Sequence, residues 1–270
     1  MSTPKPSCNK CVTCENAARN GHLTCLKYFH ENGYPWNADT CSNAAFYGHF
    51  DCLKYAHENG CPWDEWTCNF AARFGRLDYL KYVHENGCPW DKYTCSDAAT
   101  GGYLDCLKYT HENGCPWDKH TCSNAAQYGH FDCLKYAHEN GCPWDIETCH
   151  YAAANGYLDI LKYAHKNGCP WDENVCYLAK IYKNFDCLEY AHENNCPCKH
   201  KIIYDSKLDV KAPTDSIHQC CICFDNEKKV KFEPCNHKVC ISCFNKLTKT
   251  NPKFNCPFCR SLIKKDILIQ

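Results

Sequence analysis

Small apolar residues alternate with polar ones in a pattern that repeats every 27 residues through the first 200 positions. In the copy TCSNAAQY, which begins at Thr121, Cys122, Ala125 and Ala126 have helical spacing, and the pattern stops at Gly129. FDCLKYAHEN then repeats apolar residues every three positions, and CPWDIE follows, where proline cannot continue a helix. Each copy is therefore predicted to form two helices followed by a short connector.

The repeat keeps its register along this part of the chain. The first position of the pattern is held by Thr13, Thr40, Thr67, Thr94, Thr121, Thr148 and then Val175. A fixed period of this length is typical of a solenoid, in which each unit buries its apolar side against its neighbours.

GHFDCLKYAHENGC, at residues 129–142, resembles the second half of an ankyrin repeat, and TCSNAA resembles a shortened TPLHxAA opening. An ankyrin repeat has a period of about 33 residues, so about six are missing here, mostly from the segment that makes the β-hairpin. The compact form is similar to repeats found in proteins of giant DNA viruses of amoebae. The resemblance implies a mainly α-helical, ankyrin-like solenoid over residues 11–200, with about seven units.

The 29 cysteines suggest a reducing compartment rather than a disulfide scaffold. The opening residues MSTPKPSCNKC are too polar for a signal peptide, and no apolar run approaches the roughly 18 residues of a membrane span. We therefore expect no membrane association and a cytoplasmic or nuclear location, in a host cell if the protein is viral.

The recurring motif HENGCPWD could be a row of metal sites, because Cys and His are good zinc ligands. Packing is the favoured interpretation, since free Cys behaves as a small buried hydrophobe and the tryptophan can fill space between units. The histidine is expected to hydrogen-bond the neighbouring connector. Cys8, Cys11 and Cys14 have the close spacing of zinc ligands, but Cys14 is the repeat cysteine of the first unit, and the role of Cys8 and Cys11 stays open.

Positions that vary on a constant frame are the best candidates for binding a protein substrate. Two adjacent positions near the end of the first helix vary from unit to unit, although neutral drift also predicts variation. The residues chosen from them as substrate contacts are Phe46, Tyr47, Arg73, Phe74, Gln127 and Tyr128.

Residues 201–216 break the repeat and are predicted to be a linker, and a different cysteine pattern follows over residues 217–265. Four close pairs of ligands occur in order: Cys220 and Cys223, Cys235 and His237, Cys240 and Cys243, Cys256 and Cys259. Eight such ligands suit two tetrahedral zinc ions, and a segment this short needs metal to supply much of its folding energy.

The order and spacing of these ligands resemble a RING finger, with PHD and LIM modules as near alternatives. The resemblance implies a small α+β domain in which the first and third pairs hold one zinc and the second and fourth hold the other. Cys221 is left free, because only Cys220 gives the two-residue gap to Cys223.

RING domains recruit a ubiquitin-conjugating enzyme and hold its ubiquitin thioester in a reactive pose. The resemblance assigns the enzyme contact to Ile222, Pro257 and Arg260, whose planar guanidinium can bridge two partners. The apolar tail with Ile267 and Leu268 could support a homodimer through the RING, or form a strand of its own module.

The resulting hypothesis is a RING-type ubiquitin ligase whose repeats bind a protein substrate, and the alternative is a non-enzymatic adaptor with a structural zinc module. Nucleic-acid binding is not expected. Residues 201–270 contain 13 Lys+Arg and 7 Asp+Glu, a net charge of +6, but the lysines are scattered among acids without aromatic stacking motifs.

Overall fold

The computed structural model describes residues 8, 10–197, 230–233, 238–239 and 265–268. The chain divides into two compact units, residues 1–170 and residues 171–270. Within the described part of the first unit, all regular elements are α-helices and no β-strand occurs. This confirms the predicted solenoid of helix pairs without the ankyrin hairpin. The predicted boundaries at 200 and 217 stay a prediction.

The described residues of the first unit form six helix pairs. The first helices of the pairs are α1 (Cys14–Arg19), α3 (Ala38–Tyr47), α5 (Glu65–Arg73), α7 (Lys92–Gly101), α9 (Lys119–Tyr128) and α11 (Ile146–Asn155). The second helices are α2 (Leu23–Glu31), α4 (Phe50–Glu58), α6 (Leu77–Glu85), α8 (Leu104–Glu112), α10 (Phe131–Glu139) and α12 (Leu158–Lys166).

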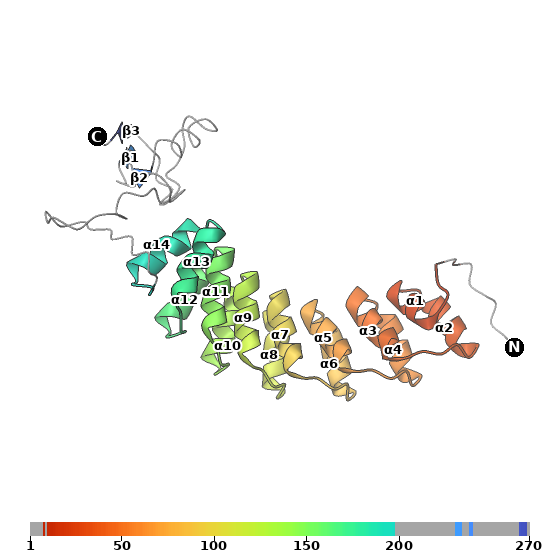
Figure 1. Cartoon of the computed structure of the whole chain (residues 1–270). Helices are drawn as coiled ribbons and strands as arrows, with labels where there is room; N and C mark the ends of the chain where they lie inside the picture. The colour runs from red at the N-terminus through yellow and green to blue at the C-terminus, as the bar shows by residue number, and fades with distance from the viewer. Residues whose placement is uncertain (1–7, 9, 198–229, 234–237, 240–264, 269–270) are drawn as a thin grey trace. The chain divides into compact units, whose positions relative to one another are not determined.

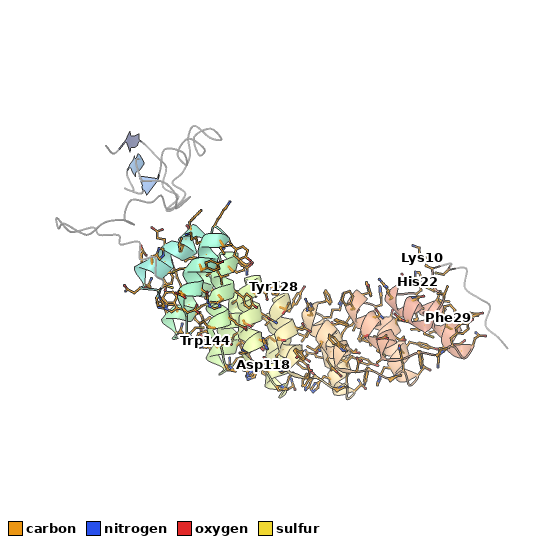
Figure 2. The ribbon with its side chains drawn as sticks, in the orientation of Figure 1. Lys10, His22, Phe29, Asp118, Tyr128 and Trp144 are labelled. Carbon is orange, nitrogen blue, oxygen red and sulfur yellow. The ribbon has the colours of Figure 1, made fainter. Side chains whose placement is uncertain are left out.

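The odd-numbered helices of this unit pack in one row and the even-numbered helices in a second row (Figure 1). Each odd-numbered helix contacts the next one, from α1 through α11, and also contacts its own partner helix. Figure 2 shows that side chains fill the space between the ribbons of successive pairs. Each unit is thus stabilised mainly by its neighbours, as expected for a solenoid.

Local sequence signals fix the ends of the helices. The carboxylates of Asp91, Asp118 and Asp145, in the connectors, accept hydrogen bonds of 2.9–3.0 Å from backbone N–H groups in the first turns of α7, α9 and α11. At the other end of α9, Gly129 has φ 80°, a left-handed conformation that glycine adopts without steric cost. The predicted stop at Gly129 is therefore confirmed.

Small side chains fill the core between the two rows. Cys122, Ala125 and Ala126 are completely buried, as is Leu134 in the second helix, and Cys133 is 1% exposed. None of the described cysteines forms a disulfide. Burial also raises the pKa of the Cys133 thiol to about 12, so it stays protonated and apolar. The interpretation of the repeated helix cysteines as core packing is confirmed at Cys122 and Cys133.

The histidine of each HENGCPWD motif stacks on the tryptophan of the same motif. The ring centroids of His111 and Trp117 are 3.9 Å apart, and the planes differ by 11°. The Nδ1 atom of His111 lies 3.0 Å from the hydroxyl of Tyr136, in the second helix of the next unit. The same contact recurs at His30, His84 and His138, with their equivalent tyrosines.

The expected hydrogen bond from the histidine to the neighbouring connector is therefore wrong, because the histidine bonds a tyrosine in the second helix of the next unit. The connector offers the face of Trp117 to His111, so the edge of the imidazole points to Tyr136 instead. The expected packing role of the tryptophan is confirmed, because its ring is half-buried between the histidine and the next unit's tyrosine.

The cysteine of the motif links one connector to the preceding one. The thiol of Cys115 donates to the backbone carbonyl of Asp91 at 3.2 Å, and Cys61, Cys88, Cys142 and Cys169 make the equivalent bond 24 residues back. A thiol is a weak donor, but the contact repeats at every junction. HENGCPWD is thus a structural junction between units.

Replacing Tyr136 by phenylalanine is expected to lower the free energy of unfolding by about 0.5–1.5 kcal/mol. The change removes the hydroxyl that meets His111 and keeps the ring that contacts Trp117. Urea denaturation followed by circular dichroism measures the effect. The control is Tyr128→Phe at an exposed position, which should change stability by less than about 0.5 kcal/mol. Equal stability of the two variants would contradict a role for the histidine–tyrosine bond.

The second unit begins with one more helix pair, α13 (Glu173–Ile181) and α14 (Phe185–Glu193). Asp172 caps α13 through a 2.9 Å bond from the backbone N–H of Asn174. Lys183, which holds the place of the glycine in earlier units, keeps the left-handed backbone with φ 62°. The pair therefore follows the repeat even where its sequence departs from it.

Three short strands follow, β1 (Val230–Glu233), β2 (Lys238–Val239) and β3 (Lys265–Leu268). They form an antiparallel sheet in the order β2-β1-β3. The tail at 265–268 thus pairs with β1 of its own chain, which favours the second of its two predicted roles. A homodimer through the RING stays a prediction. In the part of the chain that the structure describes, no helix has both the length and the apolar character to cross a bilayer.

Candidate functional sites

The residues predicted to bind zinc and the conjugating enzyme lie outside the described residues. They are Cys220, Ile222, Cys223, Cys235, His237, Cys240, Cys243, Cys256, Pro257, Cys259 and Arg260. Two of the described strands lie next to some of these residues in the sequence. The second ligand pair lies in the chain between β1 and β2, and the third pair begins directly after β2.

Three of the predicted substrate contacts lie together at the ends of α3 and α5. The ring of Phe46 meets the ring of Phe74 edge to face at 4.8 Å and lies 4.7 Å from the ring of Tyr47. Phe46 and Phe74 are half-buried, whereas Tyr47 is 40% exposed. Edge-to-face packing of this kind is favourable beyond the area that it buries.

Two residues of α5 that are not among the predicted substrate contacts extend this cluster. The ring of Phe70 lies 5.0 Å from that of Phe46, and Trp66 lies 5.7 Å from Phe70. Trp66 is 52% exposed. We call Phe46, Tyr47, Trp66, Phe70 and Phe74 the aromatic patch.

A signal for the two missed residues was present in the sequence. The positions of Trp66 and Phe70 also vary between units, since the next unit has Tyr93 and Asp97 there. In α7, Tyr93 keeps an exposed aromatic ring at the first of these positions, whereas Asp97 replaces the aromatic ring at the second.

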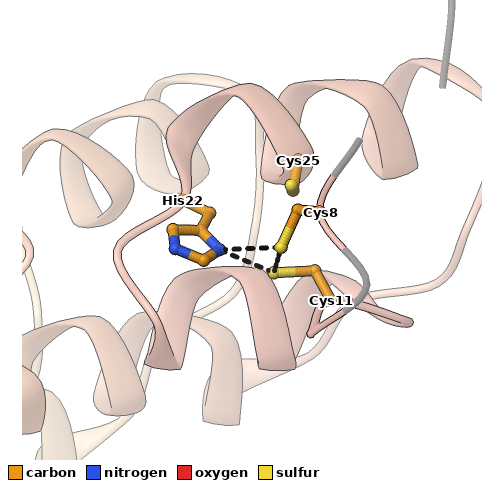
Figure 3. A group of neighbouring side chains, drawn as sticks. All are labelled: Cys8, Cys11, His22 and Cys25. Carbon is orange, nitrogen blue, oxygen red and sulfur yellow. Dashed lines mark hydrogen bonds between the residues drawn. The ribbon is translucent and has the colours of Figure 1, made fainter. Parts of the chain in front are cut away.

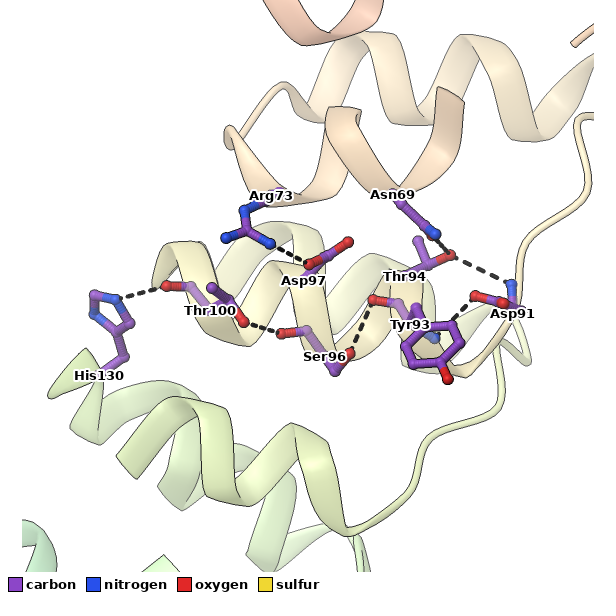
Figure 4. A network of polar contacts seen from close by, with 9 residues as sticks. All are labelled: Asn69, Arg73, Asp91, Tyr93, Thr94, Ser96, Asp97, Thr100 and His130. Atoms are coloured by element: carbon purple, nitrogen blue, oxygen red, sulfur yellow. Dashed lines mark hydrogen bonds and ion pairs between the residues drawn. The ribbon is translucent and has the colours of Figure 1, made fainter. Parts of the chain in front are cut away.

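A network of polar contacts joins α5 and α7 (Figure 4). A guanidinium nitrogen of Arg73 lies 3.0 Å from a carboxylate oxygen of Asp97. Burial raises the pKa of Asp97, and the charge of Arg73 opposes that shift. Deeper in the interface, the hydroxyl of Thr94 donates to the side-chain oxygen of Asn69 at 2.6 Å. Arg73, predicted as a substrate contact, thus also joins two units.

Gln127 and Tyr128, the remaining predicted contacts, lie on α9, two units beyond α5. Gln127 is half-buried and Tyr128 is 47% exposed. They lie on the same row of helices as the aromatic patch but are not part of it.

Among the described residues, one group of side chains lies close enough to hold a metal ion: Cys8, Cys11, His22 and Cys25 (Figure 3). Their ligand atoms all lie within 4.8 Å of one another. The sulfur of Cys8 is 3.6 Å from that of Cys11, and the Nδ1 of His22 is 3.2 Å and 3.0 Å from these two sulfurs. The repeated Cys and His of later units form no such group in the described part of the chain.

The thiols of this group have different environments. A hydrogen bond from the backbone of Lys10 lowers the pKa of Cys8 from 9.0 to about 7. Desolvation raises the pKa of Cys11 to about 12, and it also raises that of Cys25. Cys8 is therefore the thiol of the group that most readily ionises.

Two protein families match different parts of the chain. Residues 216–265 match the family described as zinc finger, C3HC4 type (RING finger), a range that contains all eight predicted ligands. Residues 41–88 and 122–165 match ankyrin repeats (many copies). A RING finger of this type binds zinc, and the match favours it over the PHD and LIM alternatives.

Two curated relatives share short segments with the chain. It is 48% identical over 48 residues to a protein of Invertebrate iridescent virus 6 named as RING finger protein 157L, covering 17% of this chain and 28% of that one. It is 35% identical over 60 residues to the E3 ubiquitin-protein ligase XB3 of Oryza sativa subsp. japonica, covering 19% of this chain and 13% of the ligase. The chain thus spans less than a third of either relative.

The fold also matches a solved structure. The crystal structure of the human ASB11 ankyrin repeat domain superposes with a TM-score of 0.50 at 19% identity, over 59% of this chain and 85% of that chain. At this identity the likeness concerns the fold.

Proposed function

Because the chain is an ankyrin-repeat protein with a C-terminal RING finger, we propose that it acts as a RING-type ubiquitin-protein ligase. In this proposal the RING recruits a ubiquitin-conjugating enzyme, and the repeats bind the protein substrate. The observation that carries it is the match of residues 216–265 to the C3HC4 family. The segment shared with a plant ubiquitin ligase supports it.

The proposed chemistry needs no covalent intermediate on this chain. A lysine amine of the substrate attacks the thioester carbonyl at the C-terminus of ubiquitin, and the thiol of the conjugating enzyme leaves. The RING contributes by positioning the two partners and by stabilising charge. Two zinc ions, held by the eight ligands between Cys220 and Cys259, would fold the module and take no part in the bond exchange.

Three residues of the RING would make the enzyme contact. Ile222 lies between the first two ligands and Pro257 between the last two, so bound zinc ions would fix the position of both. Arg260 directly follows the last ligand. Its guanidinium has five donors in a rigid fork and can bond the enzyme and ubiquitin together.

The experiment that tests the proposal is a reconstituted assay with the full chain, an activating enzyme, ubiquitin, ATP and a broad panel of conjugating enzymes. We expect ubiquitin chains on the protein itself with at least one enzyme of the panel. The absence of chains with every enzyme, from protein that contains zinc, would contradict ligase activity and favour the adaptor alternative.

The aromatic patch is the part of the repeats best suited to hold the substrate. Exposed tryptophan and tyrosine are typical centres of protein interfaces. Two arginines border the patch, Arg19 over the ring of Tyr47 and Arg76 over the ring of Phe74, each at 5.1 Å. This arrangement suits a substrate segment with an apolar centre and acidic flanks.

Replacing Trp66 by alanine is expected to reduce ubiquitination of bound substrates by about tenfold or more, since interface anchors contribute about 2 kcal/mol or more. Quantitative mass spectrometry of ubiquitinated peptides, in cells that express each variant, measures the effect. Self-ubiquitination in the reconstituted assay should be unchanged.

The control variant is Lys54→Ala, an exposed residue of α4 in the other row of helices. It should leave the same peptides unchanged. If Trp66→Ala and Lys54→Ala give the same peptides as the wild type, the aromatic patch is not the substrate surface.

A further inference from the structure

We propose that Cys8, Cys11, His22 and Cys25 bind a structural zinc ion at the N-terminal end of the repeat array. A tetrahedral zinc with Zn–S near 2.3 Å and Zn–N near 2.0–2.1 Å places two sulfur ligands about 3.8 Å apart, and sulfur and nitrogen about 3.5 Å apart. The distances in this group are 3.6 Å between the sulfurs of Cys8 and Cys11 and 3.0–3.2 Å from these to the Nδ1 of His22. Cys8, Cys11 and His22 thus already have nearly the spacing of three ligands of a zinc tetrahedron, and the sulfur of Cys25 lies within 4.8 Å of their ligand atoms (Figure 3).

The donor set selects the metal. Three thiolates and one imidazole form a Cys₃His set, which suits zinc, whereas magnesium and calcium prefer oxygen ligands. Cys11 and Cys25 are each 3% exposed, and Cys8 is half-buried. Four protein ligands leave no position for water or substrate, so the ion would be structural.

The place of His22 in the repeat supports this assignment. In later units the equivalent residue contacts the end of the first helix of the preceding unit. The Nε2 of His49 lies 3.2 Å from the backbone oxygen of Arg19, and the Nε2 of His130 lies 3.1 Å from that of Thr100. No earlier helix lies beside α1 in the described residues, and His22 faces Cys8 and Cys11 instead.

Cys8 and Cys11 are departures from the repeat pattern. The position of Cys8 is proline in the later connectors, at Pro35, Pro62, Pro89, Pro116 and Pro143. The position of Cys11 is held by Ala38, Glu65, Lys92, Lys119 and Ile146. The two residues that depart from the pattern are thus the two that complete the ligand set.

Cys25 provides the matching contrast. Its equivalent in the next unit, Cys52, is also buried in the core, at 1% exposure against 3% for Cys25. Within the described residues, Cys52 belongs to no group that could hold a metal. The same repeat cysteine therefore packs in one unit and has three potential co-ligands in the other.

A zinc ion here would close the end of the array. Among the described residues, the first unit has a neighbouring helix pair on one side only, and the open side of a solenoid unit needs a cover. Zinc would fasten Cys8 and Cys11 to the start of α2, in place of the contacts that an adjacent helix pair makes elsewhere.

The first test is the zinc content of the full-length protein, measured per chain by elemental mass spectrometry. Cys25→Ser is expected to lose one zinc ion per chain relative to the wild type, while the matched variant Cys52→Ser keeps the wild-type content. Self-ubiquitination should persist in both, because the RING ligands are untouched. Failure of this proposal is thus distinguishable from failure of the ligase proposal.

The second test uses the wild-type chain and does not depend on how a variant folds. Alkylation of each cysteine is followed by peptide mass spectrometry, with and without a zinc chelator. Bound zinc should slow the alkylation of Cys8 and Cys11 by about tenfold or more, because a metal-bound thiolate is a poor nucleophile. Equal rates with and without chelator, or equal zinc content in Cys25→Ser and the wild type, would overturn the proposal.

Discussion

Replacing Ile222 by alanine is expected to lower self-ubiquitination by about tenfold or more, while the chain keeps its zinc. Shortening an isoleucine at an apolar contact loses about 1.5–3 kcal/mol, which corresponds to a factor of about ten to a hundred in affinity for the conjugating enzyme. The substitution removes no ligand, so the metal content should stay at the wild-type value. The measurement is the rate of chain formation together with zinc per chain.

The variant Arg260→Lys, measured in the same assay, distinguishes a bridging role of Arg260 from a purely electrostatic one. Lysine keeps the positive charge but lacks the planar fork, so a bridging role predicts a loss of activity and a purely electrostatic role predicts retention. Cys221→Ser is the matched control, since it lies beside the ligand Cys220 and should keep both zinc and activity. An Ile222→Ala variant with wild-type rates would contradict the assigned contact, and one that loses zinc would indicate that Ile222 only shields the metal.

The sequence predicts the helix pairs well because their signals are local. The stop of α9 at Gly129 and the start of α10 at Phe131 follow from apolar spacing and from the conformational freedom of glycine. Neither depends on how one unit is placed against the next. The same holds for Asp118, whose cap on α9 needs only the first turn of that helix.

Contacts between units are harder to predict, because they depend on the register of the stack. The bond of His111 to Tyr136 joins residues 25 positions apart, and the side of the imidazole that makes it is set by stacking on Trp117. The aromatic patch likewise forms because α5 brings Phe70 beside Phe46.

The candidate metal site of Cys8, Cys11, His22 and Cys25 is hard to predict from the sequence, because two of its residues hold ordinary repeat positions. Two close pairs of ligands are present in the sequence, with two residues inside each pair. However, Cys25 occupies a position that elsewhere only packs, and His22 one that elsewhere contacts the preceding unit. The two pairs become a candidate metal site only because the fold brings their ligand atoms within 4.8 Å of one another.

Leu107→Ala, in α8 near the middle of the array, is expected to lower the free energy of unfolding by about 3–5 kcal/mol. Leu107 is completely buried, and alanine leaves a cavity that rigid neighbouring helices cannot fill. The measurement is urea denaturation by circular dichroism, with hydrogen exchange to locate the helices that lose protection.

Leu26→Ala is the matched comparison, because Leu26 holds the same position in the first unit and is also completely buried. Both variants remove the same atoms, but among the described residues α8 has a neighbouring helix pair on each side, whereas α2 has one on a single side. In a solenoid, stability is close to a sum of unit and nearest-neighbour terms. Leu26→Ala should therefore expose mainly α1 and α2 to exchange, whereas Leu107→Ala weakens the helices on both sides of α8. Identical exchange patterns would mean that the array unfolds as one cooperative block, and the end unit would then need no separate zinc closure for its stability.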